Sequence, residues 1–249
     1  MEYFWHITGD IPKGLGFKHF DTTHLCWLGV FLIFAVTMCI LYRKLGEKGR
    51  RRFRYILAAL IVGNELFKVT CLLIGDRYNM NYLPLHMCSI NIVLIAIHAI
   101  KPFKALDQFL YTICIPTALL ALLLPTWTKL PVLNFSHLHS FTVHIMLATY
   151  PLALTVGGDI RPKIRELWKC LVLLVCLAVP IYFFNLHFET NYMFLRKTDG
   201  IAPLVLFEDL CGSHLVAFPV IAVVIFTVMY APFEIYYHIR RKKVASAES

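Results

Sequence analysis

The chain has 249 residues, of which 59% are apolar and 16% are charged, and its mean hydropathy is +0.67. Soluble domains are usually about 45–50% apolar and about 25% charged, so the composition argues against an ordinary soluble enzyme. It also excludes a disordered chain, a collagen-like repeat and a small disulfide-stapled protein. The formal net charge of +9 fits either a nucleic-acid-binding surface or an asymmetric membrane topology.

Seven apolar stretches approach the roughly 20 residues that a helix needs to cross a bilayer. We therefore predict an all-α polytopic membrane protein, with one integral membrane domain over residues 1–249 and seven transmembrane helices in a bundle. The predicted spans are 24–42, 53–74, 84–100, 106–124, 136–156, 167–185 and 214–237. Pro116, Pro180 and Pro219 lie within apolar runs, and we expect kinks there. The connection 187–213 is expected to include a re-entrant or interfacial piece.

The basic residues divide unequally between the two sides of this bundle. Sixteen Lys and Arg fall after the first, third and fifth spans and in the C-terminal tail, against six on the other side. Because basic loops stay in the cytoplasm, the N-terminus is predicted outside and the C-terminus inside. The net charge is then a topology signal, with anionic lipid as its counter-charge, and no nucleic-acid partner is expected.

The second predicted span carries Glu65 and Lys68, which are neighbours on a helix because they are three residues apart. An ionisable side chain at the bilayer centre costs about 2.5–3.5 kcal/mol, so it is usually paired or lines a site. Two interpretations follow. The two residues form a structural ion pair, or Lys68 meets an anionic head group or a carboxylate.

The third span opens with His86, Cys88 and Asn91, and the fifth begins with a cluster of histidines, His137, His139 and His144. A lone membrane cysteine is more often inert packing, because a catalytic thiol needs an adjacent base. The histidines supply candidate bases. A His-x-His pair does not place both rings on one side of a helix, and no carboxylate lies at ligand spacing nearby. We therefore expect no metal and no cofactor.

The predicted topology gathers these polar groups at one end of the bundle. At 1.5 Å per residue, Lys68 lies about 9 Å, Cys88 about 6 Å and His144 about 12 Å inside that end. Asn185 ends the sixth span there, and Asn191 and Tyr192 follow it, where they could also simply satisfy helix ends. We predict a polar pocket in the outer-leaflet half of the bundle.

Three motifs carry a family resemblance: Leu83-Pro84-Leu85-His86-Met87-Cys88, the exit Asn185…Thr190-Asn191-Tyr192-Met193-Phe194-Leu195, and Glu65…Lys68. On these motifs, and over nearly its whole length, the chain resembles the YwaF-like integral membrane proteins of bacteria. The resemblance implies a multi-pass protein of the bacterial plasma membrane. Through a related eukaryotic branch of transmembrane ether-phospholipid acyltransferases, it implies a role in lipid metabolism: fatty acyl transfer with Cys88 as the cysteine and a fifth-helix histidine as the base.

The sequence thus leads to a hypothesis of acyl transfer to or between (lyso)phospholipids, with membrane lipids as partners and a phospholipid or acyl lipid as substrate. Cys88 is assigned as nucleophile, His144 as general base, and His137 as orienter or alternative base. Asn91 or His86 would stabilise the oxyanion. The residues assigned to substrate binding are Glu65, Lys68, His86, Asn91, Asn185, Asn191 and Tyr192.

Two other functions are open. A non-enzymatic transporter, or a protein that binds lipids or small molecules, would use the same pocket without covalent chemistry. It predicts that the Cys88 sulfur lies more than about 5 Å from every imidazole. A structural membrane subunit predicts instead that Glu65, Lys68 and the histidines are all mutually paired.

Overall fold

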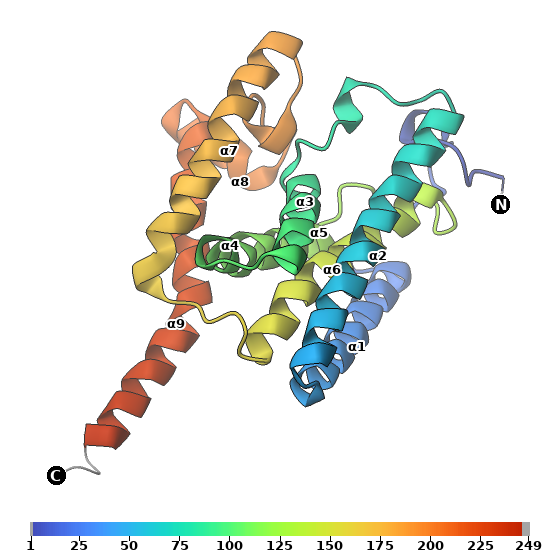
Figure 1. Cartoon of the computed structure of the whole chain (residues 1–249). Helices are drawn as coiled ribbons and strands as arrows, with labels where there is room; N and C mark the ends of the chain where they lie inside the picture. The colour runs from blue at the N-terminus through green and yellow to red at the C-terminus, as the bar shows by residue number, and fades with distance from the viewer. Residues whose placement is uncertain (1, 246–249) are drawn as a thin grey trace. The chain divides into compact units, whose positions relative to one another are not determined.

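A computed structural model describes residues 2–245, and every regular element in that range is helical (Figure 1). The prediction of an all-α chain is confirmed. The chain divides into two compact units, Met1–Ile160 and Arg161–Ser249, and each is described by itself.

The elements follow the predicted apolar stretches closely. The first unit holds η1 (Thr8–Asp10), α1 (Thr22–Lys44), α2 (Glu47–Ile74), η2 (Met80–Tyr82), α3 (Met87–Ile100), α4 (Lys104–Phe109), η3 (Leu110–Cys114), α5 (Ile115–Leu123) and α6 (Phe135–Val156). The second unit holds η4 (Ile164–Glu166), α7 (Leu167–Phe188), η5 (Tyr192–Phe194), α8 (Ala202–Cys211), η6 (His214–Val216) and α9 (Ala217–Ala245). The connection expected to include a re-entrant or interfacial piece contains the short helix α8.

Within the described residues, five helical segments are long and apolar enough to cross a membrane, whereas the sequence predicted seven. The five are Thr22–Lys44, Glu47–Ile74, Lys104–Leu123, Ile164–Phe188 and His214–Tyr236. Of the other two predicted spans, α3 has 14 residues, about 21 Å at 1.5 Å per residue and short of a hydrocarbon core of about 30 Å. The helix α6 has 22 residues but carries three histidines. The orientation of the two termini stays a prediction.

The centre of the first unit is α6, which packs against α1, α2, α3 and α5 (Figure 1). Its buried residues lie on all of its faces, and they include three histidines and a threonine. In contrast, α1 buries only four residues and exposes large apolar side chains such as Ile33, which is 70% exposed. A helix enclosed on all sides must pair its polar groups with neighbouring helices, whereas the exposed apolar surface of α1 suits contact with lipid.

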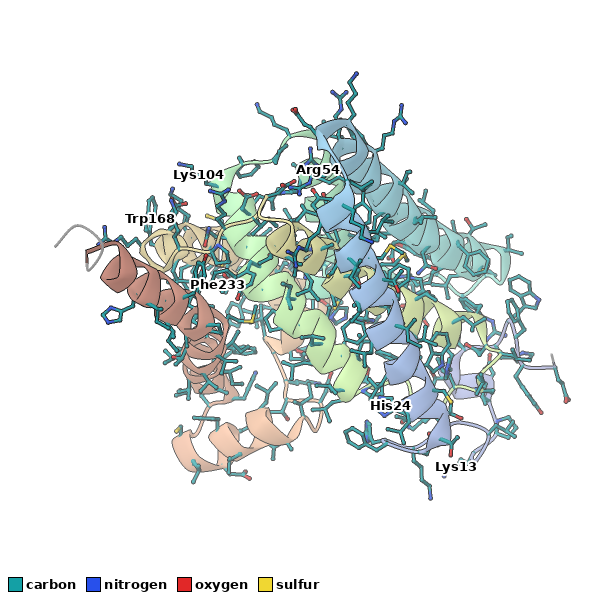
Figure 2. The ribbon with its side chains drawn as sticks, turned by 90° about the horizontal axis from the view of Figure 1, so that it is seen from below. Lys13, His24, Arg54, Lys104, Trp168 and Phe233 are labelled. Atoms are coloured by element: carbon teal, nitrogen blue, oxygen red, sulfur yellow. The ribbon has the colours of Figure 1, made fainter. Side chains whose placement is uncertain are left out.

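A cluster of polar contacts joins α1 and α2 to the C-terminal end of α6. The Tyr42 hydroxyl lies 2.5 Å from Asp159 Oδ2, and Arg50 Nη1 lies 2.6 Å from Asp159 Oδ1. Arg50 also donates to the Gly157 carbonyl at 2.9 Å, and Arg54 reaches Asp159 at 3.2 Å. Figure 2 shows Arg54 at the end of the first unit opposite to His24. These contacts fix the relative positions of three helices at that end.

At the other end, the N-terminal segment holds the connection between α5 and α6. His24 Nε2 donates to the Leu122 carbonyl at 2.7 Å, and the Phe17 amide donates to the Thr128 carbonyl at 2.8 Å. Asp21 caps α1 by accepting from the His24 amide at 2.9 Å. The amides of Lys18 and His24 stabilise this carboxylate and lower the pKa of Asp21.

The three prolines expected to kink helices differ in their surroundings. Pro116 follows η3, a π-helical turn. The backbone hydrogen bonds change register in this turn, just before Pro116, which has no N–H to donate. Pro180 lies inside α7, which continues through it to Phe188. Pro219 is in the first turn of α9, where a backbone N–H has no carbonyl partner within the helix. Its position therefore does not require a kink.

Gly157 tests the packing at the C-terminal end of α6. A Cβ added at this position would lie 2.5 Å from Cδ1 of Tyr42, whose hydroxyl is held by Asp159. We expect Gly157→Ala to lower the free energy of unfolding by about 1–3 kcal/mol, because the ring cannot move away without losing that bond. Thermal melting in detergent micelles measures the effect. The control is Gly29→Ala in α1, where the added Cβ meets nothing within 4 Å. Equal melting temperatures for the two variants would contradict the prediction.

Candidate functional site

The structure brings Cys88 and His144 together. The Sγ atom of Cys88 lies 3.1 Å from Nε2 of His144. Cys88 is the second residue of α3, and His144 lies near the middle of α6, which packs against α3. A separation of this size is within hydrogen-bond reach of a nucleophile and its base.

The proton arrangement of His144 follows from its second contact. Its Nδ1 lies 2.6 Å from the carbonyl oxygen of Ser140, one turn earlier in α6. Because a carbonyl only accepts hydrogen bonds, Nδ1 carries the proton in the neutral ring and Nε2 is left as an acceptor. The Cys88 thiol therefore donates to Nε2. The imidazole is oriented so that it can take the thiol proton.

The indole of Trp127 covers the face of His144. The two rings are nearly parallel, at 11°, with centroids 5.3 Å apart. Trp127 Nε1 is buried and finds no hydrogen-bond acceptor among residues 2–245. Trp127 was not a predicted site residue, because a tryptophan in the loop after an apolar span is usually a membrane-interface residue. Its role here depends on the path of the α5–α6 connection, for which the sequence carries no clear signal.

Glu65 bridges two donors near this pair. Its Oε1 accepts from Lys68 Nζ at 2.5 Å, and its Oε2 lies 3.0 Å from His139 Nε2. All three side chains are largely buried, with exposures of 15% or less. The predicted intrahelical pair is thus part of a three-residue cluster that joins α2 to α6. The structural-subunit hypothesis predicts pairing of Glu65 and Lys68 with the histidines, and the structure shows it for His139.

Asn91 lies one turn after Cys88 on α3 and is fully buried. Its Nδ2 is 3.5 Å from Thr117 Oγ1, a long contact, and its Oδ1 has no hydrogen-bond donor in the described part of the chain. His86 is the N-cap residue of the same helix and is half-buried. Both residues predicted to stabilise an oxyanion are therefore within one turn of Cys88 along the chain.

His137 makes contacts of a different kind. Its Nε2 accepts from the indole N–H of Trp27 at 3.0 Å, and its Nδ1 lies 3.3 Å from the Leu130 carbonyl. Both ring nitrogens are thus engaged in holding α1 and the α5–α6 connection. The atom that orients His144 is the Ser140 carbonyl oxygen rather than a ring nitrogen of His137.

The predicted binding residues Asn185, Asn191 and Tyr192 belong to the second unit. Asn185 Oδ1 accepts from Thr190 Oγ1 at 2.9 Å and from the Tyr192 amide at 2.8 Å, and its Nδ2 donates to the Tyr192 carbonyl. Asn191 binds the backbone of Arg196 and Lys197. Within this unit the two amides hold the loop that follows α7. Their role in substrate binding stays a prediction.

The donor chemistry of the site is that of a nucleophile and a base. In the range 2–245, no group of three or more His, Cys, Asp or Glu side chains is placed to hold a metal ion. The groups gathered around His144 can instead move a proton, attack an electrophile and donate hydrogen bonds.

The Glu65 cluster yields a stability prediction. Removing one member of a buried ion pair leaves the other charge unpaired, which costs about 3–5 kcal/mol when burial is complete. Glu65→Gln leaves Lys68 and His139 without their carboxylate, and since these side chains keep slight exposure we expect a loss of about 2–3 kcal/mol. The double variant Glu65→Gln/Lys68→Met removes both charges and should lose less. Melting in detergent compares them, and a double variant less stable than Glu65→Gln would refute the pairing.

Comparison with known proteins adds one result. A sequence profile of the TMEM164 family matches residues 19–230, which include every member of the Cys88–His144 site and of the Glu65 cluster. No curated protein and no solved structure matches the chain.

Proposed function

The chain belongs to the TMEM164 family of membrane proteins, and we propose that it transfers a fatty acyl group to or between (lyso)phospholipids through Cys88 and His144. The 3.1 Å contact between the thiol and Nε2 of the imidazole carries this proposal. Because Ser140 holds the proton on Nδ1, the ring faces the thiol with its basic nitrogen. Covalent catalysis by a cysteine needs such an adjacent, oriented base.

The proposed reaction has two balanced steps. First, His144 Nε2 takes the Cys88 proton as the sulfur attacks the acyl carbonyl of a lipid ester. The ester C–O bond breaks, and the leaving alcohol takes the proton back from His144, which leaves a thioester on Cys88. Then His144 takes a proton from the hydroxyl of a lysolipid, whose oxygen attacks the thioester. The C–S bond breaks, and the proton returns to the sulfur.

Lys68 is the proposed contact for the lipid head group. An ammonium group has three N–H donors, and only one is needed for Glu65 Oε1. The others can meet a phosphate oxygen. On the predicted topology, the proposed site lies in the outer-leaflet half of a bacterial plasma membrane, with the lipid chains between helices.

The two alternative functions fit the contacts less well. A transporter or lipid-binding protein without covalent chemistry predicts a sulfur far from every imidazole, whereas the observed separation is 3.1 Å. A purely structural subunit predicts that Glu65, Lys68 and the histidines are all mutually paired. Glu65 does pair with Lys68 and His139, but His137 pairs with Trp27 and His144 with Cys88.

Labelling with a fatty-acyl ester probe tests the nucleophile. We expect Cys88→Ala to abolish covalent labelling of the purified protein, because no thioester can form. Cys71→Ala is the control: Cys71 is buried in α2, whereas Cys88 is half-buried, and Cys71 should be dispensable for labelling. Undiminished labelling of Cys88→Ala would remove Cys88 from the mechanism.

Chemical rescue tests the base. His144→Ala should reduce the rate of acyl transfer about 10²- to 10⁴-fold, the usual contribution of a general base. Added imidazole should restore part of the rate, because the space left by the side chain faces the thiol. The rate of His137→Ala should not respond to imidazole, since both of its ring nitrogens make structural hydrogen bonds. Failure of imidazole to raise the rate of His144→Ala would count against proton transfer at this position.

A further inference from the structure

The indole N–H group of Trp127 is buried and has no hydrogen-bond acceptor among residues 2–245. An indole nitrogen only donates, and a buried donor without an acceptor destabilises the folded protein. Trp27 shows the ordinary solution, since its Nε1 donates to His137 at 3.0 Å. Trp127 Nε1 is buried with no acceptor anywhere in the described chain. Such a group in a folded protein requires an explanation, and a bound substrate atom is one.

The indole ring that carries this N–H lies against His144, one member of the reacting pair. The Trp127 ring is stacked on the His144 imidazole at 11°, and the same imidazole faces the Cys88 sulfur at 3.1 Å. In a parallel stack the N–H lies in the plane of the indole and points along the face of its neighbour. It is therefore not directed into the imidazole and stays available to a third group.

The segment that carries Trp127 is held in place by the N-terminal segment. His19 Nε2 lies 3.1 Å from the Pro125 carbonyl, and the Phe17 amide donates to the Thr128 carbonyl at 2.8 Å. The backbone passes so close to Gly16 that a Cβ there would lie 2.0 Å from the Thr128 oxygen. A hydrogen-bond donor stabilises a transition state most when it is fixed before the reaction, as here.

From these observations we propose that Trp127 is a further catalytic residue, whose indole N–H donates to the carbonyl oxygen of the acyl group as Cys88 attacks it. This rests on the proposed acyl transfer. When the C–S bond forms, the carbonyl electron pair moves to oxygen, and the N–H stabilises that negative charge. The electron pair returns from oxygen to re-form the C=O bond when the C–O bond to the leaving alcohol breaks. Asn91 Nδ2 already has an acceptor within reach, Thr117 Oγ1 at 3.5 Å, whereas Trp127 Nε1 has none among residues 2–245.

The test compares two reactions of the same thiol in the full-length protein. Acylation by a fatty-acyl ester passes through an oxyanion, whereas alkylation by iodoacetamide displaces iodide and forms none. Trp127→Phe keeps an aromatic ring over His144 but removes the N–H. It should slow acylation about 100-fold, the effect of losing one oxyanion donor, and leave the KM for the ester and the alkylation rate of Cys88 unchanged. Trp27→Phe is the control, since it loses an indole N–H that is bonded to His137, and both rates should stay near wild type.

Each other outcome overturns the proposal. Equal losses in acylation and alkylation would mean that Trp127 acts by packing on His144 and not through its N–H. Unchanged acylation in Trp127→Phe, with labelling that still depends on Cys88, would overturn the oxyanion role alone. Acyl labelling that survives in Cys88→Ala would overturn the proposed function itself and this inference with it.

Discussion

The enclosure of α6 is the constraint on which the first unit depends. A helix surrounded by apolar neighbours has no water to satisfy its polar side chains, so each must find a partner inside the protein. His137 pairs with Trp27, His139 with Glu65, and His144 with Cys88 and the Ser140 carbonyl. Three histidines on one helix thus have three different surroundings, and only one of them faces a thiol.

The same enclosure determines which ring nitrogen of His144 carries the proton. Two contacts on opposite sides of the His144 ring determine which nitrogen accepts, and the stacked indole of Trp127 restrains the plane of the ring. Contacts at both ends of the first unit hold in place the helices that carry these side chains. Asp159 ties α1 and α2 to one end of α6, while the N-terminal segment holds the α5–α6 connection at the other. All of these contacts are made by the protein's own groups, and preorganisation of this kind is what the proposed catalysis requires.

The positions of the helices were largely predictable from the sequence, because apolar runs and loop signals determine them locally. Cys88 and His144 were also predictable as a pair, since alternating helix directions place both near one end of the bundle. The partners that tune them were not. Trp127 lies in a connection without helical periodicity, and the Ser140 carbonyl is a backbone atom that residue types do not reveal. The two shorter or more polar helices, α3 and α6, are not among the five segments that are long and apolar enough to cross a membrane in the described part of the chain, so the count of seven spans stays a prediction.

If Cys88 carries the acyl group, mass spectrometry of the protein after incubation with phospholipid should detect it. We expect a fatty-acyl adduct that maps to the peptide containing Cys88, is cleaved by neutral hydroxylamine as a thioester, and transfers to added lysophospholipid. An adduct confined to another cysteine, or an adduct on Cys88 that lysophospholipid does not remove, would show that Cys88 is not the acyl carrier in this transfer.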